Sequence, residues 1–513
     1  MIELILQQIT ITRIVALVAV GLLGWYIADY VIEDRKIKAL GHRAPVRPSW
    51  FPLQVDTTVD VIRHAQRNEM LEFWNHMFDN YGNPVDKYTI ECRPAGRRLI
   101  FTADPENIKA ILATQFQDFG KGEQFNKEWH DFLGDSIFTT DGKRWHDSRQ
   151  LIRPQFIKDR VSDLEIFETH VNVLLSKFGG HGENVEVSDL FFRYTLDAAT
   201  DFLLGTSVDS LSQPVVFAEA FNEVQRVQIR IAQSGPLNVL IPRKTFRKNL
   251  KIIDSFIKPY IDRVVALSSD ELNKEEGYTF LHALAGYTND RTVLRDQLYA
   301  VLIAGRDTTA CTLSWTIYEL SRQPAIVSKL RQEILNVVGP SRPPTYADLK
   351  SMRYLQHIMN ETLRIYPVVP YNVRVALHDT TIPRGGGPNG DEPVGVPKDT
   401  PIAYSTLVMQ RREDIYPPES SGFAPAREFV PERWDSWTPK SWTYVPFNGG
   451  PRICIGQQFA LTEMGYTLVR IFQRYSRLES TRPGQAPGLK SDIVLSPAAG
   501  VHVAFWEASS TEK

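Results

Sequence analysis

Cys454 lies in the segment FNGGPRICIG, residues 447–456, which has the form F-x-x-G-x-R-x-C-x-G. The other two cysteines, Cys92 and Cys311, are far away in sequence and no C-x-x-C pair occurs, so we expect neither a disulfide framework nor a structural zinc site. A helix is expected directly after the segment, and the positive end of its dipole favours the thiolate form of Cys454. The pattern predicts one thiolate that acts alone; the alternative is a buried, inert cysteine in a glycine-rich turn.

A second candidate is AGRDTT, residues 304–309, in the middle of a long helical pattern. Ala304 and Thr308 are one helical turn apart and share a small, polar face, with Gly305 beside them. Thr308 can hydrogen-bond a small molecule held against this face, and Asp307 can relay protons from solvent, as a reaction that consumes protons requires. The alternative for Thr308 is a hydrogen bond from its hydroxyl to its own helix at position i−4. Arg306 is expected to point away and to pair with another acid.

Two pairs of residues stand at helical spacing, one of them charged. Glu361 and Arg364 form E-x-x-R, and Trp145 and Arg149 form W-x-x-x-R, so each pair shares one helix face. Taken alone, such pairs are usually solvated surface pairs of little energetic value. They gain meaning only from their order along the chain relative to the cysteine segment.

The composition is that of a folded globular protein. The 513 residues include 43% hydrophobic and 23% charged residues, which is too apolar for a disordered chain. The net charge of −2 gives no global field that would attract nucleic acid, so we expect no nucleic-acid partner.

The N-terminus has the pattern of a membrane anchor. Residues 14–28 carry no charge, and the apolar run continues to residue 32 with one acid, close to the roughly 20 residues that span a bilayer. A cleaved signal peptide and a buried core helix are the alternatives. More Lys and Arg follow the segment than precede it, which predicts a catalytic body on the cytosolic side. We therefore expect an anchor at 1–32, a charged and proline-rich neck at 33–50, and one domain at 51–513.

Helical patterns dominate this domain, with short strand-like stretches and no internal repeat. The sequence predicts a mainly α fold with small β-sheets and a single N-terminal transmembrane helix. Strands are expected within 86–101, 371–383 and 401–405, and the segment 383–391 reads as turn-rich. Helices are expected at 103–117, 143–159, 161–178, 188–205, 214–232, 246–268, 291–323, 325–338 and 347–365.

The cysteine segment, AGRDTT and E-x-x-R together resemble the cytochrome P450 superfamily over nearly the whole chain. The resemblance implies the cytochrome P450 fold and haem b, with Cys454 as the iron ligand and Asp307 and Thr308 as the oxygen-activating pair. A thiolate ligand pushes electron density onto haem iron and favours O–O cleavage. The remaining residues that it implies as haem contacts are Trp145, Arg149, Ala304, Gly305, Arg374, Phe447, Arg452 and Gly456.

In the same superfamily, the E-x-x-R pair is buried and joined by the arginine of a later P-E-R-W motif, which here is Arg433. The resemblance therefore implies that Glu361, Arg364 and Arg433 form a structural triad needed for haem loading. A buried charge triad has to be fully paired, so the loss of one member should be severe.

The chain looks closest to the fungal microsomal alkane and fatty-acid hydroxylases, on stretches such as VLRDQLYAVLIAGRDTTA and FNGGPRICIGQQFALTE. This implies terminal hydroxylation of a long apolar substrate at the endoplasmic reticulum membrane. Electrons would come from NADPH through a cytochrome P450 reductase, because the chain has no flavin or nicotinamide motif of its own. Animal fatty-acid hydroxylases often carry a glutamate esterified to haem at the position of Ala304, so here the haem should be held without that ester.

Other functions stay open. A tailoring oxidase that acts on a polyketide or another secondary metabolite would keep the same chemistry and change only the substrate. A haem-thiolate isomerase, dehydratase or peroxide-using enzyme would need no reductase, but such enzymes often lack the acid–alcohol pair that this chain keeps. A non-catalytic haem sensor or carrier is a further alternative.

Overall fold

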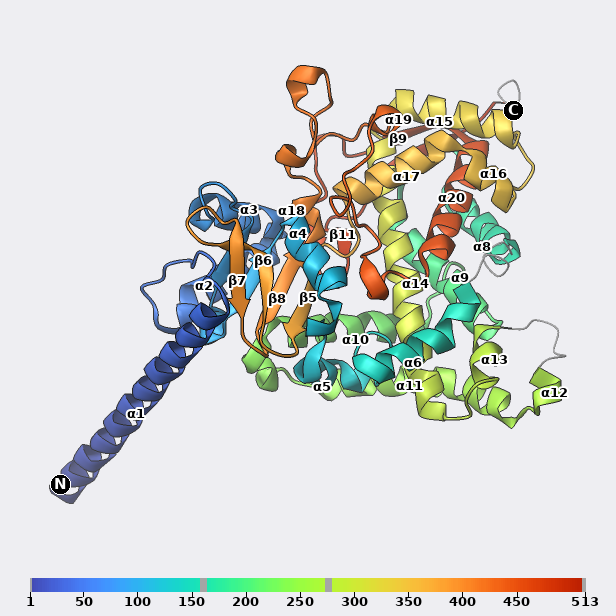
Figure 1. Ribbon diagram of the computed structural model, residues 1–513. Helices are drawn as coiled ribbons and strands as arrows, with labels where there is room; N and C mark the ends of the chain where they lie inside the picture. Colours follow the sequence, from blue (N-terminus) through green and yellow to red (C-terminus); the bar gives the residue numbers. More distant parts are fainter. Residues whose placement is uncertain (1, 157–163, 273–278, 510–513) are drawn as a thin grey trace.

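The computed structural model describes residues 2–156, 164–272 and 279–509, so residues 157–163 of the expected helices 143–159 and 161–178 lie outside it. The mainly helical fold with small sheets is confirmed, and Figure 1 shows most of the helices on one side and the larger sheet, with α1 (Ile2–Leu40), α2 and α3 beside it, on the other. The longer helices of the body are α2 (Val55–Arg67), α3 (Met70–Tyr81), α5 (Gly122–Leu133), α6 (Gly142–Ile152), α8 (Glu165–Ser176), α9 (Val187–Leu204), α10 (Val216–Gln233), α11 (Lys244–Ala266), α13 (Phe280–Ala285), α14 (Arg291–Leu320), α15 (Pro324–Val337), α16 (Tyr346–Ser351), α17 (Arg353–Ile365) and α20 (Gln457–Arg474).

Helix α14 runs through the core. The side chain of Asp290 accepts hydrogen bonds from the N–H groups of Thr292 and Val293 and so caps its first turn. The residues of α14 up to Ile303 belong to one apolar cluster with α9, α10 and α11, and those from Ala310 belong to another with α15, α17 and α20. The segment 304–309 therefore lies at the junction of the two halves of the core.

The largest sheet has the strand order β1-β2-β8-β5-β3, in which β2 and β8 are parallel and the other pairs are antiparallel. Its β5 strand carries Arg374 opposite Ile402 of β8. A second sheet has the order β4-β12-β9, and β6-β7 and β10-β11 are hairpins. The strands are β1 (Thr89–Cys92), β2 (Leu99–Thr102), β3 (Phe119–Gly120), β4 (His181–Glu186), β5 (Tyr371–Ala376), β6 (Thr380–Gly386), β7 (Glu392–Val396), β8 (Pro401–Ser405), β9 (Tyr475–Ser480), β10 (Leu489–Ser491), β11 (Leu495–Pro497) and β12 (His502–Glu507).

Three elements of the structure differ from those expected from the sequence. The helix expected at 347–365 is two helices, α16 and α17, because the backbone of Met352 is extended with ψ of 93°. The helix expected at 103–117 contains a π-helical turn, in which the N–H of Gln115 donates to the carbonyl of Ala110 at 2.8 Å. The turn-rich reading of 383–391 is wrong for residues 383–386, which form the end of β6; Gly386 pairs with Glu392 of β7, and the register shifts between Ile382 and Gly386.

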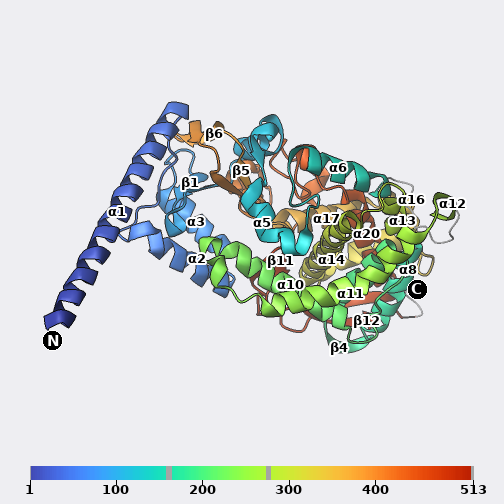
Figure 2. The ribbon, with the colours of Figure 1, turned by 90° about the horizontal axis from the view of Figure 1, so that it is seen from below.

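Helix α1 (Ile2–Leu40) projects from the body in Figures 1 and 2 and continues into the segment 33–40 that was expected to belong to the neck. This end of α1 is attached to the body: Ile37 is fully buried, and Lys36 forms an ion pair with Asp379 at 2.7 Å. Within the described part of the chain, no helix is both long and apolar enough to cross a membrane, so the anchor stays a prediction.

Candidate functional site

The Cys454 loop is shaped by a glycine. Gly450 has φ of +64°, and a Cβ there would lie 1.8 Å from the carbonyl oxygen of Leu112 in the π-helical turn, so a larger residue does not fit. The N–H of Cys454 donates to the carbonyl of Phe447 at 2.9 Å and closes the loop. Because α20 begins three residues later, the loop lies at the positive end of its dipole.

The thiol of Cys454 is accessible, yet burial raises its pKa. The N–H of Gly456 and the positive charge of Arg149 oppose this rise and favour the thiolate. The sulfur is therefore accessible to a ligand, and these two groups stabilise its anionic form.

The loop and α14 border the same region. Ile455 packs against the apolar cluster that contains Ile303 of α14. Phe447 packs against a third, small cluster that contains Cys311, one turn beyond Thr308. A flat group bound at Cys454 would therefore lie between this loop and the segment 304–309.

Helix α6 holds the loop from one side. The Nη1 of Arg149 donates to the carbonyl of Ile453 at 3.0 Å, and the guanidinium of Arg452 lies 4.6 Å from the centre of the Trp145 ring. Arg452 also donates to Asp141, at 2.6 Å, just before α6 begins. The structure thus brings together Trp145, Arg149 and Arg452 beside the Cys454 loop.

Positive charge accumulates beside Arg452. Burial and the charges of Arg374 and Arg452 hold the pKa of Lys121 well below its usual range. Lys121 and Arg374 share one neutral acceptor, the Oδ1 of Asn372, at 3.4 and 2.9 Å. Asp141 is the carboxylate that the structure places against this cluster, and it also accepts hydrogen bonds from the N–H of Lys121. The cluster therefore has an excess of positive charge.

These residues fit haem. The Nε of Arg452 is buried without a hydrogen-bond partner in the described structure, so it can bind an anionic group, and the cation cluster suits two propionates. A Cβ on Gly305 would meet only Ala199, at 4.0 Å, and one on Gly456 only Phe156, at 3.8 Å. Close packing within the protein therefore does not require these glycines, and the space beside them would admit a flat macrocycle.

On α14, Ala304, Gly305 and Thr308 are partly accessible, whereas Arg306 and Asp307 are buried. The hydroxyl of Thr308 donates to the carbonyl of Ala304 at 2.6 Å, the alternative geometry expected for a helical threonine, and its lone pairs stay available as acceptors. Burial raises the pKa of Asp307. The expectation that Arg306 pairs with another acid is wrong, because its Nη1 lies 3.2 Å from the Oδ1 of neighbouring Asp307.

The predicted triad is assembled. Glu361 and Arg364 are fully buried, and their side chains form an ion pair at 2.8 Å. Arg433 reaches the other carboxylate oxygen of Glu361 at 2.7 Å. Trp434 and the N–H of Val430 also donate to this carboxylate, at 3.0 and 2.9 Å. Glu361 thus balances two buried guanidinium groups.

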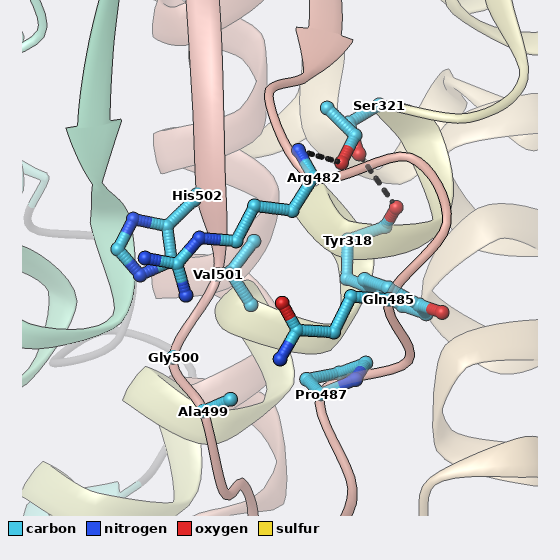
Figure 3. Close-up of a pocket in the computed structure, with 10 residues that line it drawn as sticks. Tyr318, Ser321, Arg482, Gln485, Pro487, Ala499, Gly500, Val501 and His502 are labelled. Atoms are coloured by element: carbon cyan, nitrogen blue, oxygen red, sulfur yellow. Dashed lines mark hydrogen bonds between the residues drawn. The ribbon is translucent and has the colours of Figure 1, made fainter.

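Sequence reasoning missed Lys121, Asn372 and Asp141, since no motif connects residues so far apart in the chain. A shallow cavity between the end of α14 and strands β9 and β12, lined by residues such as Tyr318, Arg482 and His502 (Figure 3), contains none of the predicted site residues.

A buried acid beside α14 was also missed. Glu463 of α20 is 2% exposed, and burial raises the pKa of its carboxyl from 4.5 to about 8, while a hydrogen bond with Thr309 opposes the rise. The folded state therefore binds the Glu463 proton more tightly than the unfolded chain does. The stability contributed by the protonated carboxyl is complete below a pH of 4.5 and is lost as the pH rises through about 8.

Glu463→Gln should therefore leave the free energy of unfolding unchanged at a pH of about 4 and raise it on the order of 4 kcal/mol at a pH of about 9. Denaturant unfolding across this range measures the difference. Glu479→Gln, at an exposed acid paired with Arg477, is the control and should follow the wild type. If Glu463→Gln and wild type show the same pH dependence of unfolding, the raised pKa of Glu463 is contradicted.

Comparison with known proteins agrees with this geometry. A sequence profile described as Cytochrome P450 matches residues 59–502. The chain is 49% identical to cytochrome P450 monooxygenase pvhE of Talaromyces variabilis, over 93% of this chain and 92% of that protein. It is 41% identical to cytochrome P450 52A1 of Candida tropicalis, over 92% of this chain and 90% of that protein. It is 39% identical to cytochrome P450 52A12 of Debaryomyces hansenii, over 94% of this chain and 96% of that protein. With a profile match over most of the chain and relatives this similar, the protein belongs to the cytochrome P450 family of monooxygenases.

Proposed function

We propose that this protein inserts one oxygen atom of O₂ into the terminal C–H bond of a long-chain apolar substrate, a fatty acid or an alkane. The observation that carries the chemistry is the accessible Cys454, which borders the same region as AGRDTT of α14. The substrate class rests on the resemblance to the fungal alkane and fatty-acid hydroxylases. It is supported by Val369 and Val373, apolar side chains that are 40% and 39% exposed on either side of the start of β5.

Haem b, when bound, supplies the iron that activates O₂. Cys454 would be the protein ligand of that iron, and Phe447 would shield the sulfur from water. Arg452 and Arg374 would bind the propionates together with Lys121, while Trp145 and Arg149 hold the loop in place. Ala304 has no carboxyl group, so no ester to haem can form there.

Thr308 and Asp307 would deliver protons to the oxygen site. The hydroxyl of Thr308 donates to the carbonyl of Ala304, so its lone pairs can accept a hydrogen bond from a water held against α14 and orient that water. The buried carboxyl of Asp307 has a raised pKa, which brings it closer to the working pH, as a proton donor requires.

Thr308→Ala should therefore uncouple the reaction rather than weaken substrate binding. We expect the product formed per NADPH to fall roughly tenfold and hydrogen peroxide to rise, because general acid catalysis supplies factors of this size or larger. Thr312→Ala is the matched control, since Thr312 makes the same type of bond, to Thr308 at 2.9 Å. If the ratio of product to NADPH in Thr308→Ala equals that of wild type, Thr308 has no such role.

Electrons would come from NADPH through a cytochrome P450 reductase that docks on the side of the Cys454 loop. Lys143 and Arg144 begin α6, the helix whose Arg149 contacts the loop, and their side chains are 87% and 67% exposed. Each forms an ion pair with an exposed acid, Asp147 or Asp135, that an acidic reductase surface can displace.

We also propose that residues 1–32 anchor the protein in the endoplasmic reticulum membrane with the body in the cytosol. The apolar side chains of Ile14, Leu17 and Val20 on α1 are 55–72% exposed, and those of Trp50 and Phe51 are 63% exposed or more. Such surface is stable in lipid and unfavourable in water.

Deletion of 1–32 leaves the ion pairs of α1 that begin at Glu33 in place and should release much of the protein from microsomes. The measurement is sedimentation of membranes followed by assay of the soluble fraction. The exposed neck residues should retain some protein on the membrane, so release need not be complete. Protection of the body from protease in sealed microsomes would contradict the cytosolic orientation.

A second candidate is a tailoring oxidase that acts on a polyketide or another secondary metabolite. The 49% identity to pvhE exceeds the 41% and 39% identity to the two proteins of the 52 series, so the substrate of this protein can differ from theirs. Turnover of a panel of fatty acids and alkanes against polyketide chains of similar length distinguishes the two candidates.

A further inference from the structure

Arg306 is a buried cation next to the proposed proton donor. It is 4% exposed on α14, and its guanidinium lies 5.4 Å from the ring of Phe192 on α9 and 5.6 Å from the ring of Phe221 on α10. Its Nε also donates weakly to the carbonyl of Phe192, at 3.5 Å. Two aromatic rings and a carbonyl therefore fix the planar guanidinium between three helices.

The anionic partner of Arg306 in this position is Asp307. The Nη1 of Arg306 lies 3.2 Å from the Oδ1 of Asp307, which is 2% exposed. That oxygen makes no hydrogen bond among the described residues, and the buried Nε2 of Gln225 on α10 has no hydrogen-bond partner there either. Gln225 nevertheless interacts with the Asp307 carboxyl and, like Arg306, favours its ionised form.

We propose that Arg306 is the positioning residue of Asp307: its fixed positive charge keeps the buried carboxyl able to ionise and directs it, so that Asp307 can be reloaded with a proton in each cycle. The proposal rests on the proposed role of Asp307 in proton delivery. Besides Arg306 and the neutral Gln225, Cys311 on the next turn interacts electrostatically with Asp307. Burial raises the pKa of the Cys311 thiol, so this thiol stays protonated and neutral. Among these three groups, Arg306 therefore supplies the positive charge that faces Asp307.

The test compares Arg306→Met, which keeps an apolar side chain between the rings and removes the charge, with Arg306→Lys, which keeps the charge. Infrared difference spectra on photolysis of bound carbon monoxide follow the protonated carboxyl of Asp307, identified by its absence in Asp307→Asn. In Arg306→Met the titration midpoint of this band should rise by about one pH unit or more. At neutral pH the product formed per NADPH should fall roughly tenfold and recover as the pH is raised.

Arg306→Lys should keep the product formed per NADPH and the titration midpoint of the carboxyl band close to those of wild type. Arg291→Met, at an exposed arginine of the same helix, is the control and should match wild type in both measurements. An Arg306→Met protein with the wild-type midpoint overturns the proposal, whether its coupling is normal or reduced. If Arg306→Met does not fold, Gln225→Leu should shift the midpoint in the same direction by less, and an unchanged midpoint there overturns the proposal. If Asp307→Asn itself remains coupled, the proposed function of Asp307 fails instead.

Discussion

Cys454→Ala should abolish both turnover and the red-shifted absorption band that a reduced, carbon monoxide-bound haem-thiolate gives. The sulfur of Cys454 is accessible, and the N–H of Gly456 and the charge of Arg149 favour its thiolate. Neither remaining cysteine can replace it, because Cys92 and Cys311 are buried and burial raises the pKa of each thiol. The activity of Cys454→Ala should therefore fall to background.

The carbon monoxide difference spectrum of purified protein measures this effect. Cys92→Ala is the matched control, since it removes a cysteine from β1 and should keep the band at full height. A red-shifted band that persists in Cys454→Ala would show that another group binds the iron.

Glu361→Gln should prevent stable haem loading rather than slow the chemistry. Its carboxylate is 0% exposed and is the common partner of Arg364 and Arg433, at 2.8 and 2.7 Å. An amide leaves two buried guanidinium groups without a counter-charge, and breaking a buried ion pair from one side costs about 3–5 kcal/mol. That cost is a large share of the roughly 5–15 kcal/mol by which a typical domain is stable. We expect protein with little or no bound haem and a lower unfolding midpoint.

The haem content per polypeptide and the unfolding midpoint measure this loss together. Arg353→Ala on the same helix, α17, is the control: its ion pair with Asp435 is exposed at 3.3 Å, so its loss should cost less than about 1 kcal/mol. Haem content equal to that of wild type in Glu361→Gln would contradict the structural role of the triad.

The parts of the site that the sequence predicts are contiguous motifs. The Cys454 loop and AGRDTT each place their residues within one turn or one helix, so spacing alone fixes their relative positions. The triad could be predicted only through the resemblance, since nothing local brings Arg433 to Glu361. Helix α14 could be predicted because it has 30 residues without an internal proline.

The parts that could not be predicted depend on contacts between distant segments. Lys121 reaches Asn372 across 251 positions, and Gln225 of α10 interacts with Asp307 of α14 although the two residues are far apart in the sequence. Strands β4, β9 and β12 pair segments from both halves of the chain, which no local pattern indicates. The partner of Arg306 was wrongly predicted because the expectation used only the angle between residues around the helix. The side chains of Arg306 and the adjacent Asp307 bend toward each other and form an ion pair.

The most direct test of the proposed function is turnover of a long-chain fatty acid by the full-length protein with a cytochrome P450 reductase, NADPH and isotopically labelled O₂. We expect a product that is hydroxylated at the terminal carbon and carries one labelled oxygen atom, and no product when the reductase or NADPH is omitted. A product whose new oxygen comes from water, or one that forms without the reductase, would contradict the proposed function.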